Sequence, residues 1–266
     1  MKKYVHGYSK AENNRLYDQA GTLTVLLHGD TRYEKGETVL EAGCGVGAQT
    51  IILAKNSPKA DITSIDFSPV SVKKAAQLIK RKNIKNVRLQ QADIFDLPFK
   101  DGSFDHVFVC FVLEHLKDPG KALNALKKVL KKGGSITVIE GDHDTSLFHP
   151  YSEAAMKTIK CLIELQAKIG GNSLIGRQLY PLLNKAGFGK IDISPRFVYA
   201  DASRQEMVEG FTKKTYIAMV KGVKDEAISS GMIDGKTWEK GIRDLNKTAG
   251  KDGVFCYTFF KGTAYK

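Results

Sequence analysis

Residues 38–50 read Thr-Val-Leu-Glu-Ala-Gly-Cys-Gly-Val-Gly-Ala-Gln-Thr, and this stretch decides the fold. Val39 and Leu40 are typical of the end of a buried parallel strand, and the glycines that follow predict a tight turn. From Ala48 the apolar spacing becomes helical. A strand, a glycine turn and a helix in this order form a cradle for a nucleotide, because the backbone approaches the ligand closely and free helix N–H groups point at it.

The glycines alone leave two nucleotide cofactors open. Gly43, Gly45 and Ala48 satisfy the dinucleotide pattern Gly-x-Gly-x-x-(Gly/Ala), and Asp66 follows at a suitable spacing. Glu41 argues against a dinucleotide, because a like-charge pair with the diphosphate at ~5 Å and an effective dielectric of ~20 costs roughly 3 kcal/mol. The same carboxylate suits S-adenosylmethionine (SAM), which carries an ammonium group and a cationic sulfur.

Acidic residues also close the next two predicted strands. Asp66 ends a strand over residues 61–66, at the ligand edge of a parallel sheet, where a carboxylate can accept both ribose hydroxyls. Capping of the following helix is the alternative role. Asp93 follows a short strand over residues 87–91 and can accept the adenine amino group, while Ile94 packs on the ring.

The continuous apolar run over residues 104–111 fits a central strand buried on both faces. A helix over residues 119–130 and a strand over residues 135–140 follow. The strand-helix order repeated five times predicts a doubly wound parallel sheet. The end of the apolar run places Phe111 and His115 beside the expected reaction centre, where His115 acts as a base or as a hydrogen-bonded structural residue.

Taken in this order, the motifs resemble those of the class I SAM-dependent methyltransferases, particularly the small-molecule branch similar to the ubiquinone/menaquinone C-methyltransferases (methyltransferase type 11). The resemblance covers roughly residues 36–141. The segments that carry it are Val39–Gly47, Gln91–Asp93, Leu97–Phe99, Ser103–Asp105, Leu113–Leu116 and Lys131–Gly134, together with Asp66.

The resemblance implies an α/β fold with a doubly wound, seven-stranded, mostly parallel, Rossmann-like sheet whose last strand is antiparallel. It also implies SAM as the cofactor. The expected cofactor-binding residues are Glu41, Gly43, Cys44, Gly45, Asp66, Phe67, Asp93, Ile94 and Phe111, with Tyr17 added from the N-terminal segment.

The regions that flank this core are predicted to belong to the same domain. Residues 1–35 form an N-terminal helical segment, which either packs on the core or forms a lid from which Tyr17 reaches the ligand. Residues 36–145 form the SAM-binding core. Residues 146–266 supply the insertions of a helical cap, together with strands six and seven.

The segment Gly141–Asp144 directly follows the predicted fifth strand, where the substrate should sit. His143, His115 and Asp142 are therefore the candidate catalytic residues. Two acids and a histidine can hold a divalent ion or serve as a general base, whereas helix capping in a solvated loop is the structural alternative. No metal site is predicted.

The 266-residue chain, with 42% apolar and 26% charged residues, has the composition of an ordinary soluble globular protein. Its start lacks the apolar run of a signal peptide and no stretch approaches ~18 apolar residues, so we expect a cytoplasmic protein without a membrane partner. The four cysteines form no Cys-x-x-Cys pair. The net charge of +12 permits an anionic partner, but the lysines follow helical patterns typical of solvated faces, which disfavours nucleic acid.

The favoured function is SAM-dependent methyl transfer to an O, N, C or S atom of a small molecule. The same fold acting on nucleic acid or protein is the first alternative. The glycines and Asp66 also allow an NAD(P)-dependent oxidoreductase, and the cradle alone allows a SAM-binding protein without catalysis. An oxygen acceptor can require a base, whereas a thiolate or neutral amine can react without one.

Overall fold

The computed structural model describes residues 10–266, so the first nine residues of the predicted N-terminal segment lie outside the described part. Contacts divide the chain into two compact units. The glycine-turn unit comprises Thr24–Glu140, Ile175–Pro195 and Phe260–Lys266. The helical unit comprises the described residues up to Leu23, Gly141–Leu174 and Arg196–Phe259. The two units therefore interleave along the chain, whereas the predicted segments were consecutive.

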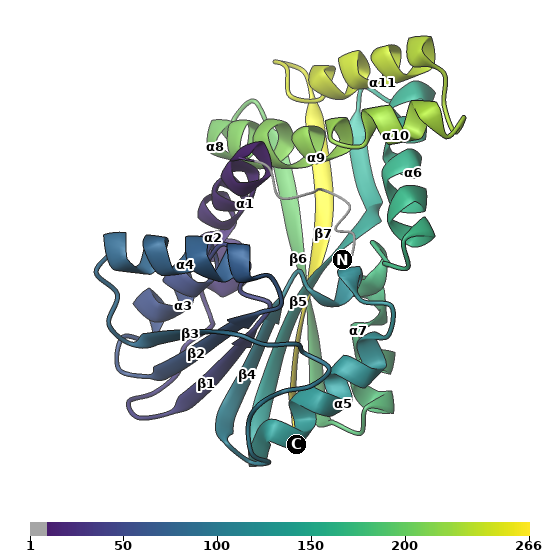
Figure 1. Cartoon of the computed structure of the whole chain (residues 1–266). Helices are drawn as coiled ribbons and strands as arrows, with labels where there is room; N and C mark the ends of the chain where they lie inside the picture. The colour runs from purple at the N-terminus through teal and green to yellow at the C-terminus, as the bar shows by residue number, and fades with distance from the viewer. Residues whose placement is uncertain (1–9) are drawn as a thin grey trace. The chain divides into compact units, whose positions relative to one another are not determined.

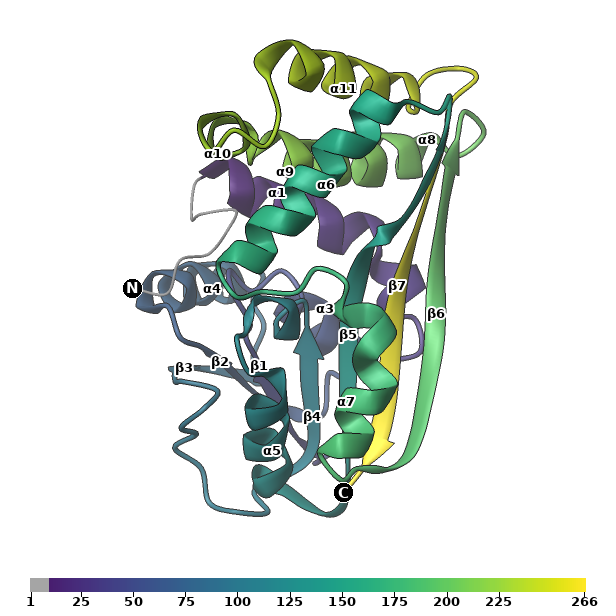
Figure 2. The same cartoon turned by 90° about the vertical axis from the view of Figure 1, so that its right-hand side faces the viewer.

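The strands form one sheet in the order β3-β2-β1-β4-β5-β7-β6 (Figure 1). Their bounds are β1 Thr38–Ala42, β2 Asp61–Asp66, β3 Val87–Gln91, β4 Phe104–Cys110, β5 Leu130–His149, β6 Gly189–Asp201 and β7 Val254–Tyr265. Parallel pairs join β1 to β2 and β4, β2 to β3, and β4 to β5. Figure 2 shows β7 pointing opposite to β4. The predicted seven-stranded, mostly parallel sheet is confirmed.

Helices connect most of these strands. They are α1 Lys10–Thr22, α2 Thr24–His28, α3 Thr50–Asn56, α4 Pro69–Arg81, the 3-10 turn Leu113–His115, α5 Pro119–Val129, α6 Glu153–Lys168, the 3-10 turn Ile175–Gln178, α7 Leu179–Lys185, α8 Gln205–Met207, a π-helix Val208–Ile217, α9 Ala218–Lys221, α10 Lys224–Ser229 and α11 Gly235–Lys247. Side-chain caps fix two starts: Ser68 Oγ accepts the Ser71 N–H at the head of α4, and Asp118 accepts the Lys121 N–H at the head of α5. Each cap precedes a proline, whose fixed φ suits the first helical position.

The strand order explains why helices cover both faces of the sheet in the glycine-turn unit. From β1 the chain steps outward to β2 and β3, then returns to β4 and β5 on the other side of β1. Because parallel crossovers are right-handed, α3 and α4 lie on one face and α5 on the other. The direction reverses between β1 and β4. The carboxyl ends of strands at such a reversal are where open α/β sheets bind ligands.

An apolar cluster fills the face of this sheet that α5 covers. Leu40 of β1 and Val107 of β4 are fully buried in it, together with Leu123 and Leu126 of α5 and Leu183 of α7. Because side chains of the sheet and of both helices pack in one cluster, the position of β1 is fixed. The glycine turn that follows β1 is therefore anchored to the core.

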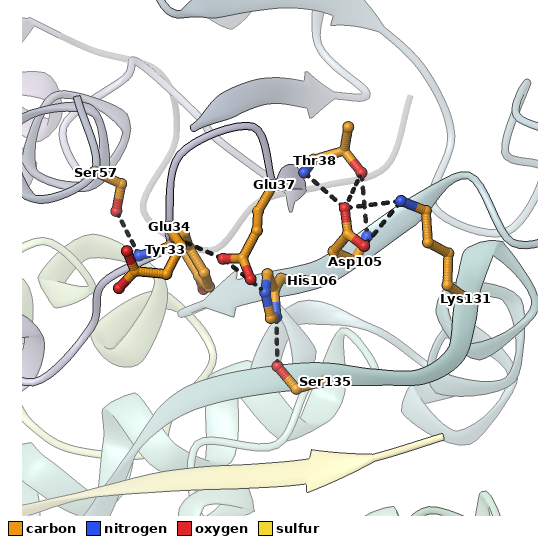
Figure 3. Close-up of polar contacts among 9 residues, drawn as sticks. All are labelled: Tyr33, Glu34, Glu37, Thr38, Ser57, Asp105, His106, Lys131 and Ser135. Atoms are coloured by element: carbon orange, nitrogen blue, oxygen red, sulfur yellow. Dashed lines mark hydrogen bonds and ion pairs between the residues drawn. The ribbon is translucent and has the colours of Figure 1, made fainter. Parts of the chain in front are cut away.

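A polar network joins the amino ends of β1, β4 and β5, opposite the glycine turn (Figure 3). Asp105 accepts the Thr38 N–H at 2.9 Å and an N–H of Lys131 at 2.8 Å. His106 lies between Glu37, at 3.1 Å, and Ser135, whose Oγ is 2.7 Å from His106 Nδ1. These contacts stabilise the register of the three strands.

Strand β5 is longer than the sequence predicts. The fifth strand is predicted over residues 135–140, whereas β5 continues to His149. The prediction that Gly141–Asp144 forms a solvated loop is wrong, because this segment lies within the strand and both Asp142 and His143 are buried. The extension has its partner in β7, where the Thr258 N–H donates to Thr145 Oγ1 at 2.9 Å.

Within the predicted helical cap, the segment Val208–Ile217 is a π-helix. Thr215 Oγ1 donates to the carbonyl of Gly210, five residues earlier, at 2.7 Å. Gly210 also lies against α1, since a Cβ at this position would be 2.0 Å from Thr22 Oγ1. Apolar periodicity does not distinguish a π-helix from an α-helix, so the sequence predicts only a helical segment.

Candidate cofactor site

The glycine turn lies at the carboxyl end of β1 and has the left-handed backbone that glycine favours. The φ angles of Gly43, Gly45 and Gly47 are 82°, 53° and 84°. The N–H groups of Gly43 and Cys44 both donate to the carbonyl of Ile65, at 2.8 and 2.9 Å, which ties the turn to β2. Burial raises the pKa of the Cys44 thiol, so this side chain acts as a small apolar group.

The three glycines differ in the space around them. A Cβ at Gly43 would lie 2.4 Å from a methyl group of Val112, and one at Gly47 would lie 3.1 Å from the Ala75 Cβ of α4. At Gly45 nothing lies within 4 Å. The outer glycines thus permit close packing of the protein, and the middle one leaves open space beside the backbone.

Glu41 is buried directly before the turn, with 2% of its surface exposed. Its Oε2 accepts hydrogen bonds from Thr50 Oγ1 at 2.7 Å and Ser64 Oγ at 2.6 Å. Burial raises the pKa of this carboxyl to about 7, and the two hydroxyl groups oppose the shift. At neutral pH the carboxyl is close to its midpoint, so a nearby cation can draw it into the charged form.

Asp66 links the glycine turn to the start of α4. Its Oδ2 accepts the Gly45 N–H and its Oδ1 accepts the Ser68 N–H, each at 2.8 Å. Burial raises the pKa of Asp66, although both backbone donors oppose the shift. Phe67 follows with 51% of its surface exposed. The sequence-based assignment of Asp66 to the sheet edge is therefore matched by a direct contact with the turn.

The segment after β3 holds the residues assigned to adenine. Asp93 Oδ1 accepts the Phe95 N–H at 3.0 Å, which closes a short turn. Ile94 is buried in the apolar cluster with Ile65 and Val109. Asp93 thus marks the edge of the sheet, whereas Ile94 belongs to the core beneath it.

Phe111 follows β4 and has a φ of 58°, which is unusual for a bulky residue. Its N–H donates to the Ile139 carbonyl at 2.9 Å. In the next turn, His115 Nε2 lies 3.5 Å from Glu114 Oε1. A strained backbone at the end of a central strand is typical of functional sites.

The remaining sequence-based candidates lie in the helical unit. His143 Nδ1 is 2.7 Å from the hydroxyl of Tyr257, and the His143 N–H donates to the Ser173 carbonyl at 2.9 Å. Asp142 is fully buried, and its Oδ1 accepts the Asp144 N–H at 3.2 Å. Tyr17 lies on α1 and is partly exposed.

Tyr257 is a contact that sequence reasoning missed. It lies 114 residues from His143, and the aromatic strand that contains it predicts only an edge strand. The glycine at position 141 is the local feature that accompanies this contact. A Cβ there would lie 2.3 Å from the Tyr257 hydroxyl, so a larger residue would not fit.

Two properties of the described residues bear on other classes of function. Within residues 10–266, no three His, Cys, Asp or Glu side chains are grouped so as to hold a metal ion. In the same part of the chain, no helix combines the length and the apolar character that a membrane crossing requires.

A family model described as a methyltransferase domain matches residues 33–187, more than half of the chain. The chain belongs to the methyltransferase-domain family. Membership agrees with the predicted methyltransferase class and favours it over the NAD(P) alternative. The site fits SAM: open space borders the backbone at Gly45, and the Glu41 carboxyl suits a cation.

Two relatives and one solved structure illustrate what the chain is similar to. A protein of unknown role in a Streptomyces fradiae transposon is 33% identical over 202 residues, which cover 75% of this chain and 57% of that protein. The demethylmenaquinone methyltransferase of Staphylococcus carnosus is 32% identical over 139 residues, covering 52% of this chain and 57% of the enzyme. This chain thus spans just over half the length of the curated relatives it matches. The YcgJ protein of Bacillus subtilis shares the fold, with a TM-score of 0.57 and 15% identity over 93% of this chain and 97% of that one.

Proposed function

We propose that the protein transfers a methyl group from SAM to an O, N, C or S atom of a small molecule. The observation that carries the proposal is the convergence of Glu41 and Asp66 on one glycine turn, in a chain of the methyltransferase-domain family. When bound, SAM supplies a methyl group on a cationic sulfur. Because the positive charge disperses as the methyl group leaves, the protein's own task is to align the reactants and exclude water.

The proposed roles follow the position of each residue along the sheet edge. Glu41 receives the ammonium group of SAM, and Asp66 receives the ribose hydroxyls with the oxygen lone pairs that its two backbone bonds leave over. The other proposed cofactor contacts are Gly43, Cys44, Gly45, Phe67, Asp93, Ile94, Phe111 and Tyr17.

Where the acceptor needs a base, we place it at His143. Its imidazole is held by the Tyr257 hydroxyl, which fixes the ring orientation as a base requires. His115 and Asp142 are the other candidates.

Transfer of label from methyl-labelled SAM to a cell extract, followed by identification of the product, tests the proposed methyl transfer to an acceptor. Tyr257→Phe should reduce the transfer while leaving the affinity for SAM unchanged, and a complete absence of labelled product would favour a SAM-binding protein without catalysis.

The small-molecule acceptor is supported by the relative from Staphylococcus carnosus, which by its name acts on demethylmenaquinone. The net charge of +12 is the one feature that favours nucleic acid or protein instead. Retention on RNA or DNA that weakens with added salt would support that alternative. A cytoplasmic location belongs to the same proposal, and cell fractionation tests it.

Calorimetry with SAM tests the cofactor half. We expect Asp66→Ala to weaken SAM binding about tenfold or more, because a charge-assisted hydrogen bond contributes roughly 1.5–3 kcal/mol. Asp101→Ala is the matched control, since Asp101 is an exposed acid of the same unit. Binding of NADH without binding of SAM would overturn the proposal.

A further inference from the structure

The segment Phe111–Leu113 lies against the glycine turn in a conformation that needs support. Phe111 adopts the left-handed region, which a bulky side chain disfavours. The next residue, Val112, places its two γ-methyl groups where a Cβ at Gly43 would stand, at 2.4 and 3.0 Å from that position. The glycine turn and this segment are thus fitted to each other, and a shift of one would disturb the other.

Two adjacent residues of β5 hold this segment. The N–H of Phe111 donates to the Ile139 carbonyl, at 2.9 Å. The carboxyl Oε1 of Glu140 accepts the next two N–H groups, from Val112 at 3.0 Å and from Leu113 at 2.7 Å. Ile139 and Glu140 therefore accept three successive backbone N–H groups, and two of these hydrogen bonds depend on the Glu140 side chain.

Glu140 is an unusual residue to find in this position, because its side chain is completely buried. Its second oxygen, Oε2, has no hydrogen-bond partner among residues 10–266. Burial, followed by the nearby carboxylate of Glu114, raises the pKa of Glu140 well above its usual range and favours the neutral acid. An apolar side chain here would avoid this cost but would leave the partly buried N–H of Val112 and the buried N–H of Leu113 without this acceptor.

We propose that Glu140 is a positioning residue for SAM binding, which holds Phe111–Leu113 against Gly43 by accepting two backbone hydrogen bonds. The inference rests on the proposed function only in taking SAM as the ligand of the glycine turn. Glu140 acts through the backbone of the segment that follows β4 and does not contact the cofactor itself. The acceptor oxygen is the feature that matters, and the negative charge is dispensable.

The test compares Glu140→Gln, which keeps an acceptor oxygen in a neutral side chain, with Glu140→Leu, which removes it. We expect the glutamine variant to bind SAM within about threefold of the wild-type protein and the leucine variant to bind about tenfold or more weakly. Ser135→Ala is the matched control, because it removes one hydrogen bond nearer the amino end of the same strand (Figure 3). It should lower stability without changing SAM affinity.

Amide hydrogen exchange gives a second readout that needs no ligand. The amides of Val112 and Leu113 should exchange faster in Glu140→Leu than in the wild-type protein and remain protected in Glu140→Gln. If the leucine variant does not fold, Glu140→Asp replaces it, since the shorter side chain keeps an acid and withdraws the acceptor from the two N–H groups.

Several results would overturn the inference. Wild-type SAM affinity in the leucine variant would show that Glu140 stabilises the fold alone. A glutamine variant as weak as the leucine variant would show that charge matters instead. Failure of the wild-type protein to bind SAM would overturn the proposed function, whereas equal exchange of the two amides in all variants would overturn the role of Glu140 by itself.

Discussion

Burial shifts the ionisation of single residues in opposite directions in this protein. A buried carboxyl group keeps its proton to higher pH, as Glu41 does, whereas a buried imidazole loses its proton at lower pH. His28 is the second case: it is fully buried beside Phe108, with ring centroids 5.7 Å apart. The two residues have different consequences, because Glu41 lies at the proposed cofactor site and His28 lies in the core.

The affinity for SAM should depend on pH through Glu41. Because burial raises the pKa of this carboxyl to about 7, the form that attracts a cation predominates above that pH. We expect the wild-type affinity to fall about tenfold between pH 8 and pH 6. Glu41→Gln should bind more weakly with a flatter profile, and the difference between the two calorimetric profiles removes any titration of SAM itself. Parallel profiles would contradict the role assigned to Glu41.

His28 should make the protein sensitive to acid. Burial, followed by the charge of Lys261, lowers its pKa from 6.5 to about 4, so the unfolded chain takes up a proton first as the pH falls. Stability is therefore lost between about pH 6.5 and pH 4, by a total of about 3 kcal/mol. Denaturant unfolding of His28→Leu over this range should show a loss smaller by that amount. An equal loss in both proteins would refute the prediction.

At the scale of an element, the glycine turn combines two separate requirements. One is the positive φ angle, and the other is the lack of space for a side chain. Gly43 meets both, with a φ of 82° and Val112 in contact, whereas Gly36 has the same φ and nothing within 4 Å. This pair of residues allows the two requirements to be measured separately.

Alanine at these two glycines should therefore have unequal effects. Gly36→Ala should lower the free energy of unfolding by about 1–2 kcal/mol, the cost of a left-handed alanine. Gly43→Ala should cost about 1–3 kcal/mol more, because its Cβ overlaps Val112. Thermal or denaturant unfolding measures both values. Equal losses would mean that the segment containing Val112 moves aside freely.

At the scale of the whole molecule, contacts between distant parts of the chain hold the glycine-turn unit together. Lys261, near the end of the chain, is only 6% exposed in its side chain. Its ammonium group donates to the Leu27 carbonyl at 3.3 Å and to Thr31 Oγ1 at 2.7 Å, and it forms an ion pair with Asp30. These contacts connect β7 to the segment that precedes β1.

Removal of this buried ammonium group should destabilise the fold. Lys261→Met should lower the free energy of unfolding by about 2–3 kcal/mol, because it leaves buried acceptors without a donor. Lys131→Met is the matched control: its ion pair with Asp105 is 46% and 30% exposed, so the loss should be about 0–1 kcal/mol (Figure 3). Urea unfolding of the two variants checks the difference, and a loss for Lys261→Met no larger than the control would count against it.

The sequence by itself determined the glycine turn, the succession of strands and helices along the chain around it, and the acid at the end of β2. These features are local, because an apolar strand, a glycine triplet and an acid at a strand end are each readable within about ten residues. Asp66 illustrates this. One helix and one strand separate it from Gly45 along the chain, and its Oδ2 accepts the Gly45 N–H at 2.8 Å.

Only the tertiary structure decided the continuation of β5 to His149, the contact between His143 and Tyr257, and the support of Phe111–Leu113 by Glu140. Each depends on a partner that lies far away in the sequence and leaves no periodic sign of its own. Strand β5 can continue past Glu140 because β7 supplies its hydrogen bonds. The buried Glu140 lies where β5 stops pairing with β4, because the N–H groups of Val112 and Leu113, just after β4, need an acceptor there. This requirement follows from the packing of the chain and not from the local sequence.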